Sequence, residues 1–434
     1  MDFEKKIKRL LFGGILLALT VPMLLTFYPF MEFKPLNGSF ENKEKPELSF
    51  DALYSGTYQK SMEEYLNENT GGRPRMVRIN NQLEWWLFKS TNVDNVIIGK
   101  NNYLYEQSYI DAYYGSDFVG DAVVQDKIAK LNRIKDTLES RGVKLLVAFA
   151  PGKGSFYPEY FPDKVRIKKS RTNYQAYREA FAQTDIHFFD IRSWFESMKH
   201  TSKYPLFPKT GIHWSSYGEV LSADSLIRIM NNLTVETQLN TIQIDAIHTS
   251  KYAYNRDDDI EESMNLLYNI KDSVLGYPEF HSINHSAKRT TSVLTIADSY
   301  FWGMFNWGAQ EYFENGPFWY YNREIYPESF TEQTFVQDLI DLSYEVEKND
   351  VVLILFTDAN LKDFAYGFID RLFDEYCSNG REKREMRISK IIEDIHNTPE
   401  WLETIKAQAK KEGIPLEDAL RKNAVYLMEQ EKKR

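Results

Sequence analysis

The chain has a single cysteine, Cys377, among its 434 residues. One cysteine cannot form an internal disulfide, and it excludes any metal site built from a cysteine cluster. Lys and Arg number 53 against 63 Asp and Glu, which gives a formal charge of −10, and no long basic block follows the first ten residues. Nucleic-acid binding needs clustered cations to neutralise phosphates. We therefore expect no nucleic-acid partner, no metal and no other cofactor.

Internal repeats and low-complexity tracts are also absent. The composition is 43% apolar, 27% charged and 15% aromatic, which is typical of a folded globular protein and not of a disordered one. The length allows two or three domains.

An uncharged apolar stretch runs from Leu10 to Met31. As a helix rising about 1.5 Å per residue, it is long enough to cross a hydrocarbon core of roughly 30 Å. The basic residues before it place the short N-terminal end in the cytoplasm and the rest of the chain outside: Lys5, Lys6, Lys8 and Arg9. A cleaved signal peptide is the alternative, but no small-x-small site follows before Glu32. We predict an uncleaved transmembrane anchor over residues 1–31.

The remaining sequence divides into three parts. Residues 32–48 are polar and contain two prolines, which indicates an extended tether. Residues 49–376 are expected to form the main domain, with a polar insertion at about 231–288, and residues 377–434 a helical extension. We expect this extension to pack on the domain; a docking arm for a partner is the alternative.

The insertion contains an acidic cluster, Asp257-Asp258-Asp259, followed by Glu261 and Glu262. Its spacing lacks the glycine and terminal glutamate of an EF-hand loop. We therefore interpret the cluster as a solvated face.

Continuous apolar strands alternate with helices from about Val124 onward. The predicted strands are Val143 to Ala150, Ile186 to Ile191, Thr291 to Ala297 and Val351 to Phe356. This pattern is typical of an α/β fold in which helices cover both faces of a mostly parallel sheet. Active residues of such sheets lie at the carboxyl ends of the strands. Lys153, Ser299 and Asp358 each follow a strand, so we expect them to converge on one edge.

Two short motifs together suggest acyl transfer. Ser299 follows a strand in Ala297-Asp298-Ser299-Tyr300, and His213 stands in Gly211-Ile212-His213-Trp214. A serine needs a base to become a nucleophile, and histidine suits that role because its pKa lies near neutrality. Backbone N–H groups at the turn after the serine are expected to stabilise an oxyanion. Each motif alone has an ordinary structural explanation, so only the two motifs together indicate a catalytic site.

The pair resembles the SGNH-like domain of the alginate O-acetyltransferase AlgJ and AlgX family. In that family an Asp-x-His-Trp element precedes a Gly-Asp-Ser element, and the same order holds here. Further similar stretches extend the resemblance over roughly Ser49 to Asn360: Arg73 to Phe88, Ile98-Gly99-Lys100 with Leu104-Tyr105, and Pro151-Gly152-Lys153 with Tyr157-Pro158-Glu159. The resemblance implies an SGNH-like three-layer domain between an N-terminal transmembrane helix and a C-terminal helical extension.

It also implies roles for individual residues. Ser299 would be the nucleophile and His213 the base, with Asp298 in the same catalytic element although its side chain is expected to point into the turn. Substrate or oxyanion contacts are expected from Lys153, Trp214 and Tyr300.

Two positions depart from the family pattern. Ala297 replaces the glycine before Asp-Ser, and Gly211 replaces the aspartate that would hold the imidazole. Either a Ser-His dyad acts alone, or a carboxylate comes from elsewhere, with Asp190 and Asp358 as candidates, or the domain is degenerate.

The resemblance implies an extracytoplasmic O-acyltransferase that acetylates a cell-surface or exported polysaccharide. The chain would be a single-pass protein of a bacterial inner membrane with its main domain in the periplasm. Its expected partners are the polysaccharide and a multispanning membrane O-acyltransferase that delivers the acyl group. A non-catalytic glycan-binding or scaffold subunit and a carbohydrate esterase remain as alternatives.

Overall fold

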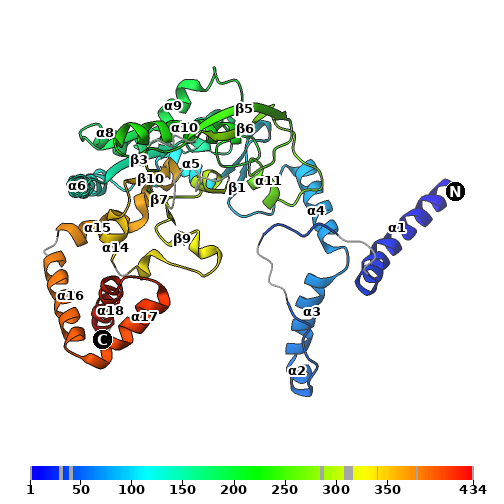
Figure 1. Cartoon of the computed structure of the whole chain (residues 1–434). Helices are drawn as coiled ribbons and strands as arrows, with labels where there is room; N and C mark the ends of the chain where they lie inside the picture. The colour runs from blue at the N-terminus through cyan, green and yellow to red at the C-terminus, as the bar shows by residue number, and fades with distance from the viewer. Residues whose placement is uncertain are drawn as a thin grey trace.

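A computed structural model describes residues 2–28, 33–38, 43–165, 167–283, 288–306, 316–339, 341–377 and 380–432. At its centre lies a six-stranded sheet in the order β4-β3-β10-β7-β8-β9 (Figure 1). The strands are β3 (Lys144–Ala150), β4 (His187–Asp190), β7 (Val293–Ala297), β8 (Phe318–Tyr320), β9 (Glu324–Tyr326) and β10 (Val351–Thr357). All neighbours are parallel except β8 and β9. The predicted mostly parallel sheet is therefore confirmed; β8 and β9 had no recognisable apolar run.

Helices cover both faces of the sheet because successive residues of β3 and β10 point to opposite sides. Leu145, Val147 and Phe149 belong to one buried cluster, whereas Leu146 and Ala148 belong to the other. The first cluster contains α6 (Asp121–Glu139), α8 (Asn173–Phe181) and α15 (Phe368–Cys377); the second contains α5 (Gln107–Tyr114), α9 (Ile191–Met198) and α10 (Ser216–Leu233). This arrangement is the predicted three-layer α/β fold.

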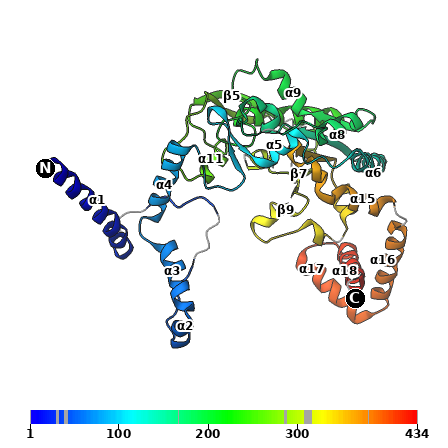
Figure 2. The same ribbon diagram turned by 180° about the vertical axis from the view of Figure 1, so that it is seen from behind.

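The N-terminal elements project from the sheet domain, on the side away from the C-terminal helices (Figure 2). They are α1 (Asp2–Phe27), α2 (Phe50–Ser55), α3 (Thr57–Asn69) and α4 (Arg73–Phe88). Within α1, Phe3–Phe27 is long and apolar enough to span a membrane, a test that a signal sequence also passes. Residues 29–31 of the expected anchor, and residues 32 and 39–42 of the expected tether, lie outside the described residues.

Next along the chain comes the antiparallel hairpin of β1 (Val96–Ile98) and β2 (Leu104–Glu106), joined through the short helix η1 (Lys100–Asn102).

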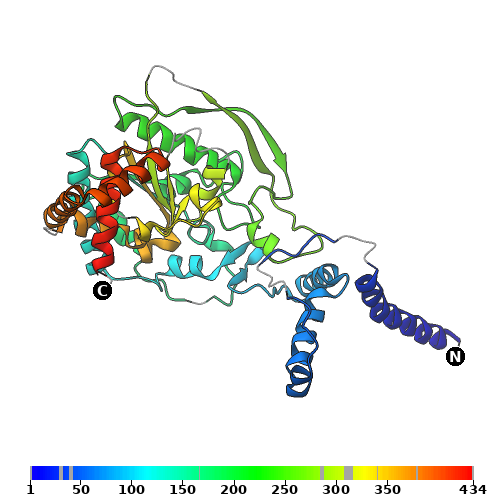
Figure 3. The same cartoon turned by 60° about the horizontal axis from the view of Figure 1, so that its bottom comes forward.

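The polar insertion folds into a long antiparallel hairpin of β5 (Thr241–Ser250) and β6 (Leu275–Ile283), with α11 (Asp259–Ser263) between its strands (Figure 3). Residues 284–287 lie outside the described residues. The interpretation of its acidic cluster as a solvated face is wrong, because Asp257 is only 2% exposed and Glu261 only 5%.

The C-terminal extension forms α16 (Gly380–His396), α17 (Pro399–Glu412) and α18 (Leu416–Lys432). These helices pack chiefly on one another, through Ile395, Ile405, Ala409, Ala419 and Leu420. Arg421 of α18 links them to the domain by donating a 2.8 Å hydrogen bond to Asp341, at the start of α14 (Leu342–Glu347). The extension is thus a small helical unit tied to the domain, and not a tail spread over its surface.

Candidate active site

Ser299 stands directly beyond the carboxyl end of β7, before the short helix α12 (Phe301–Met304), and is partly exposed. The preceding Asp298 fixes the turn. Its fully buried carboxylate accepts hydrogen bonds from the N–H groups of Tyr300 (3.0 Å) and Thr357 (2.7 Å) and from the Asn360 amide (2.8 Å). Burial raises the pKa of Asp298, and these hydrogen bonds oppose the shift. Asp298 therefore holds the turn, into which its side chain was expected to point, and the carboxylate that contacts His213 belongs to another residue.

His213 lies on the loop before α10 and faces Ser299. Its Nε2 atom is 2.9 Å from the Ser299 hydroxyl oxygen. Its Nδ1 atom contacts the carboxylate of Asp259, the first residue of α11. In the tautomer that this network favours, Nδ1–H donates to Asp259 and Nε2 accepts the serine proton. Ser299, His213 and Asp259 thus form the hydroxyl–imidazole–carboxylate series of a catalytic triad.

The Asp259 carboxylate is held firmly in this position. Its other oxygen accepts the N–H groups of Ile212 (2.8 Å) and Ile260 (2.7 Å). Burial acts to raise the pKa of Asp259, but His213 and the hydrogen bonds outweigh it, and the net pKa lies below the ordinary 3.8. Asp259 is therefore ionised wherever the enzyme would work. Glu106, at the end of β2, is a further electrostatic neighbour: burial and the charge of Asp259 raise its pKa, and His213 opposes them.

Gly211 explains why a carboxylate from the insertion can reach His213. A Cβ at this position would lie 2.6 Å from the Asp257 carbonyl oxygen and 3.0 Å from an Asp259 carboxylate oxygen. The segment carrying Asp259 occupies that space, and Thr210 donates a 3.1 Å hydrogen bond to the same Asp257 carbonyl. The Asp257 carboxylate in turn accepts the Ser216 N–H (2.9 Å) at the start of α10. The absence of a side chain at Gly211 is thus what leaves room for Asp259 beside His213.

The two carboxylates expected to replace the missing aspartate are engaged elsewhere. Asp190 caps α9 by accepting the Ser193 N–H (2.9 Å) and accepts the Tyr174 hydroxyl (2.8 Å). Asp358, 3% exposed, pairs with Arg192 at 2.8 Å. Both stand at the predicted sheet edge, but neither contacts His213.

Of the three residues expected to contact substrate or the oxyanion, Lys153 and Tyr300 instead hold the loop of His213. Lys153 is fully buried and donates hydrogen bonds to the carbonyls of Lys209 (2.7 Å) and Gly211 (2.6 Å). Burial lowers its pKa, and Asp272 and Asp259 oppose the shift. The Tyr300 hydroxyl donates to the Ile212 carbonyl at 2.9 Å.

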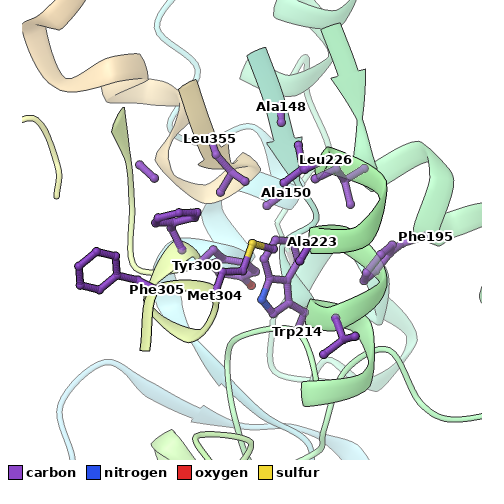
Figure 4. Packing of buried hydrophobic residues seen from close by; sticks show 14 of the residues in the cluster. Ala148, Ala150, Phe195, Trp214, Ala223, Leu226, Tyr300, Met304, Phe305 and Leu355 are labelled. Carbon is purple, nitrogen blue, oxygen red and sulfur yellow. The ribbon is translucent and has the colours of Figure 1, made fainter. Parts of the chain in front are cut away.

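The Trp214 indole N–H donates to Glu219 at 3.2 Å, and its ring packs beside Tyr300 in the buried cluster (Figure 4). Lys153 and Tyr300 therefore position the loop that carries the base, whereas Trp214 donates to α10.

Three residues near Ser299 were missed by the sequence analysis. Asp259 and Arg256 come from the insertion, whose irregular sequence gave no signal for a site. The Arg256 guanidinium donates a 3.3 Å hydrogen bond to the Ser299 carbonyl. Tyr321 follows the unrecognised strand β8; burial raises the pKa of its hydroxyl, and a hydrogen bond with Ser299 opposes the shift. Among the described residues, no group of three or more His, Cys, Asp or Glu side chains is arranged to hold a metal ion.

Comparison with known proteins confirms the resemblance to the AlgJ and AlgX family. Residues 96–258 match the family model described as SGNH hydrolase-like domain, acetyltransferase AlgX. This matched segment includes His213 and ends one residue before Asp259.

Curated relatives include the probable alginate O-acetylase AlgJ of Pseudomonas syringae pv. tomato, 27% identical over 158 residues, which are 36% of this chain and 39% of the relative. The protein of the same name from Azotobacter vinelandii is 24% identical over 149 residues, or 34% of this chain and 37% of that relative. The chain thus spans less than half the length of these relatives. The solved O-acetyltransferase domain of Pseudomonas putida AlgJ is 17% identical and covers 64% of this chain and 99% of its own, with a TM-score of 0.43.

Proposed function

We propose that this protein is an O-acyltransferase that passes a small acyl group, most simply acetyl, to a hydroxyl of a polysaccharide through an acyl-Ser299 intermediate. The observation that carries the proposal is the series Ser299–His213–Asp259, in which each side chain contacts the next. The match of residues 96–258 to an acetyltransferase domain supports the same chemistry.

In the proposed reaction, Ser299 Oγ attacks the acyl carbonyl carbon of the donor while His213 Nε2 takes its proton across 2.9 Å. The donor alcohol leaves with its electron pair and takes that proton from His213. An acceptor hydroxyl then gives its proton to His213 and attacks acyl-Ser299, and the serine regains a proton as the ester product leaves. Asp259 stays ionised and stabilises the imidazolium that forms in both halves.

We further propose that α1 anchors the domain on the outer face of an inner membrane. The charge asymmetry at Lys5, Lys6, Lys8 and Arg9 supports this orientation. An anchor would raise the effective concentration of Ser299 near a multispanning membrane O-acyltransferase that supplies the acyl group. The polysaccharide substrate is inferred from the printed names of the relatives, which are alginate O-acetylases.

The alternative of a non-catalytic glycan-binding subunit rested on Gly211 and on the long helical extension. Asp259 supplies the carboxylate that Gly211 lacks, so this reason for inactivity is removed. A carbohydrate esterase would use the same three residues and differs only in accepting water.

The test uses the full-length protein in detergent, p-nitrophenyl acetate as donor and oligosaccharides as acceptors. Wild type is expected to release p-nitrophenol and to yield O-acetylated oligosaccharide, and Ser299→Ala to do neither. Ser197→Ala is the matched control, since this hydroxyl bonds only the Trp194 carbonyl on α9. Turnover that survives Ser299→Ala would remove the proposed nucleophile. Acetate release without transfer would favour the esterase, and glycan binding without either reaction the scaffold.

A further inference from the structure

An acyl-serine mechanism also needs a donor for the oxyanion, and the expected donors after Ser299 are occupied. The Tyr300 N–H donates to the Asp298 carboxylate (3.0 Å), and the Phe301 N–H to the Asp298 carbonyl (3.3 Å). The Trp302 N–H donates to the Ser299 carbonyl (3.3 Å). The backbone N–H groups of the three residues that follow Ser299 are therefore already bonded within the turn, which leaves the N–H of Ser299 itself.

The side chains expected as oxyanion contacts are committed as well. Lys153 and Tyr300 donate to carbonyls of the His213 loop, and Trp214 donates to the Glu219 carboxylate. The Tyr321 hydroxyl is engaged with Ser299 itself. Two donors close to the nucleophile remain without an acceptor among the described residues: the Ser299 N–H and the Nη1 group of Arg256.

Arg256 is placed beside the reacting serine by its other nitrogen. Nη2 donates to the Ser299 carbonyl at 3.3 Å, so the guanidinium plane lies against the nucleophile's main chain. Nη1 of the same planar group is buried and finds no protein acceptor among the described residues. Leaving a charged donor buried without an acceptor costs more free energy than leaving a neutral one, so a partner is expected for Nη1.

Arg256 forms no ion pair with a carboxylate in the part of the chain that the structure describes, although three aspartates follow it in sequence. Asp257 instead bonds Ser216, and Asp259 bonds His213. A guanidinium without a paired carboxylate retains its full attraction for a developing negative charge.

The backbone that delivers Arg256 is strained. Asn255 and Arg256 both have positive φ, 54° and 75°, a region costly for residues other than glycine. This turn leads directly into Asp257 and Asp259. The turn therefore brings Arg256 to the Ser299 carbonyl, and the residues that follow it bring the Asp259 carboxylate to His213.

We propose that Arg256 is a catalytic residue whose Nη1 group, together with the Ser299 N–H, forms the oxyanion hole. The proposal rests on the acyl-serine function proposed above. When Ser299 Oγ bonds the acyl carbon, the carbonyl π pair moves onto oxygen, and the serine proton goes to His213. Arg256 donates to that oxyanion in both tetrahedral intermediates. Each intermediate collapses when the pair returns, and the expelled alkoxide takes the proton from His213.

The test compares full-length Arg256→Gly with wild type in detergent, measuring the p-nitrophenol burst from p-nitrophenyl acetate. Glycine suits the positive φ, so the backbone of the turn should survive the substitution. We expect the acylation rate to fall about 10²- to 10³-fold with little change in KM. Sub-denaturing guanidinium chloride should restore part of the rate in Arg256→Gly but not in Ser299→Ala. Arg228→Gly, with its side chain 65% exposed on α10, serves as the arginine control.

Arg256→Lys provides a second variant that keeps the charge but not the fork of donors. It should retain a rate between those of wild type and Arg256→Gly. An unchanged p-nitrophenol burst in Arg256→Gly overturns the proposal. It is also overturned if the acylation rate falls but is not restored by added guanidinium and is not higher in Arg256→Lys. A wild-type protein that forms no acyl-Ser299 overturns the acyl-transfer function and this proposal together, which distinguishes the two failures.

Discussion

Restoring the family's aspartate by Gly211→Asp is expected to lower activity in this protein. Any side chain at 211 begins with a Cβ that would lie 2.6 Å from the Asp257 carbonyl oxygen and 2.9 Å from its carbon. Ordinary contacts of a Cβ begin near 3.4 Å. The clashing atoms belong to the Asp257 backbone, so the segment from Asp257 to Asp259 must move away from residue 211 by several tenths of an ångström.

The expected loss of activity follows from the position of Asp259 on this segment. Because it carries the carboxylate that bonds His213 Nδ1, its retreat loosens the base in front of Ser299. A misplacement of 1 Å can cost about 100-fold in rate. We therefore expect Gly211→Ala to lower kcat by roughly 10- to 100-fold. Gly211→Asp, which also places a second negative charge beside Asp259, should lose at least as much.

Steady-state hydrolysis of p-nitrophenyl acetate measures this effect, with thermal melting as a check on folding. Overpacking should cost both variants about 1–3 kcal/mol of stability. Gly276→Ala is the matched control, because its Cβ would lie 2.6 Å from the Tyr204 ring and not against the triad. It should lose stability but keep kcat. A Gly211→Asp protein as active as wild type would refute the assignment of Asp259.

Two further predictions concern the insertion. Asp259→Asn removes the charge that stabilises the imidazolium, so kcat should fall about 10³- to 10⁴-fold in the ester assay. In the Ser299→Ala background the same substitution should cause no further loss, because the three residues act as a unit. A loss below tenfold in the single variant would contradict the triad. Burial raises the pKa of Glu261 from 4.5 to about 8; the nearby carboxylates of Asp258, Asp272 and Glu262 act in the same direction and the hydrogen bond from the Ile270 N–H opposes them, so the folded state keeps a proton that the unfolded chain loses. The free energy of unfolding should therefore fall as pH rises from 4.5 to 8, and denaturant titrations should show a flatter dependence for Glu261→Gln.

The sequence predicted those features that depend on local pattern. Apolar runs such as Val351 to Phe356 identify buried strands, since parallel strands covered on both faces need apolar residues at every position. Ser299 and His213 were identifiable because each belongs to a short motif whose residues are adjacent in sequence. Strands β8 and β9, at three residues each, are too short for a periodic signal.

The rest of the site depends on contacts between distant segments. Asp259 is 46 residues from His213 along the chain, and its acidic neighbours resemble a solvated surface. Only the fold shows that the strained turn at Asn255 and Arg256 returns this segment to the Ser299 edge. Gly211 was the one signal in the sequence, because a glycine in place of an expected aspartate leaves room for another segment beside the histidine. Lys153 was found at the predicted edge, but its direction toward the Lys209 and Gly211 carbonyls depends on packing.

The most direct test is mass spectrometry of the full-length protein quenched during turnover of p-nitrophenyl acetate. We expect a single acetyl group on the peptide that contains Ser299 in wild type. We expect none in Ser299→Ala and a strongly reduced amount in Asp259→Asn. An acetyl group on another residue, or equal labelling of wild type and Asp259→Asn, would contradict the assignment of Ser299, His213 and Asp259 as the acyl-transfer site.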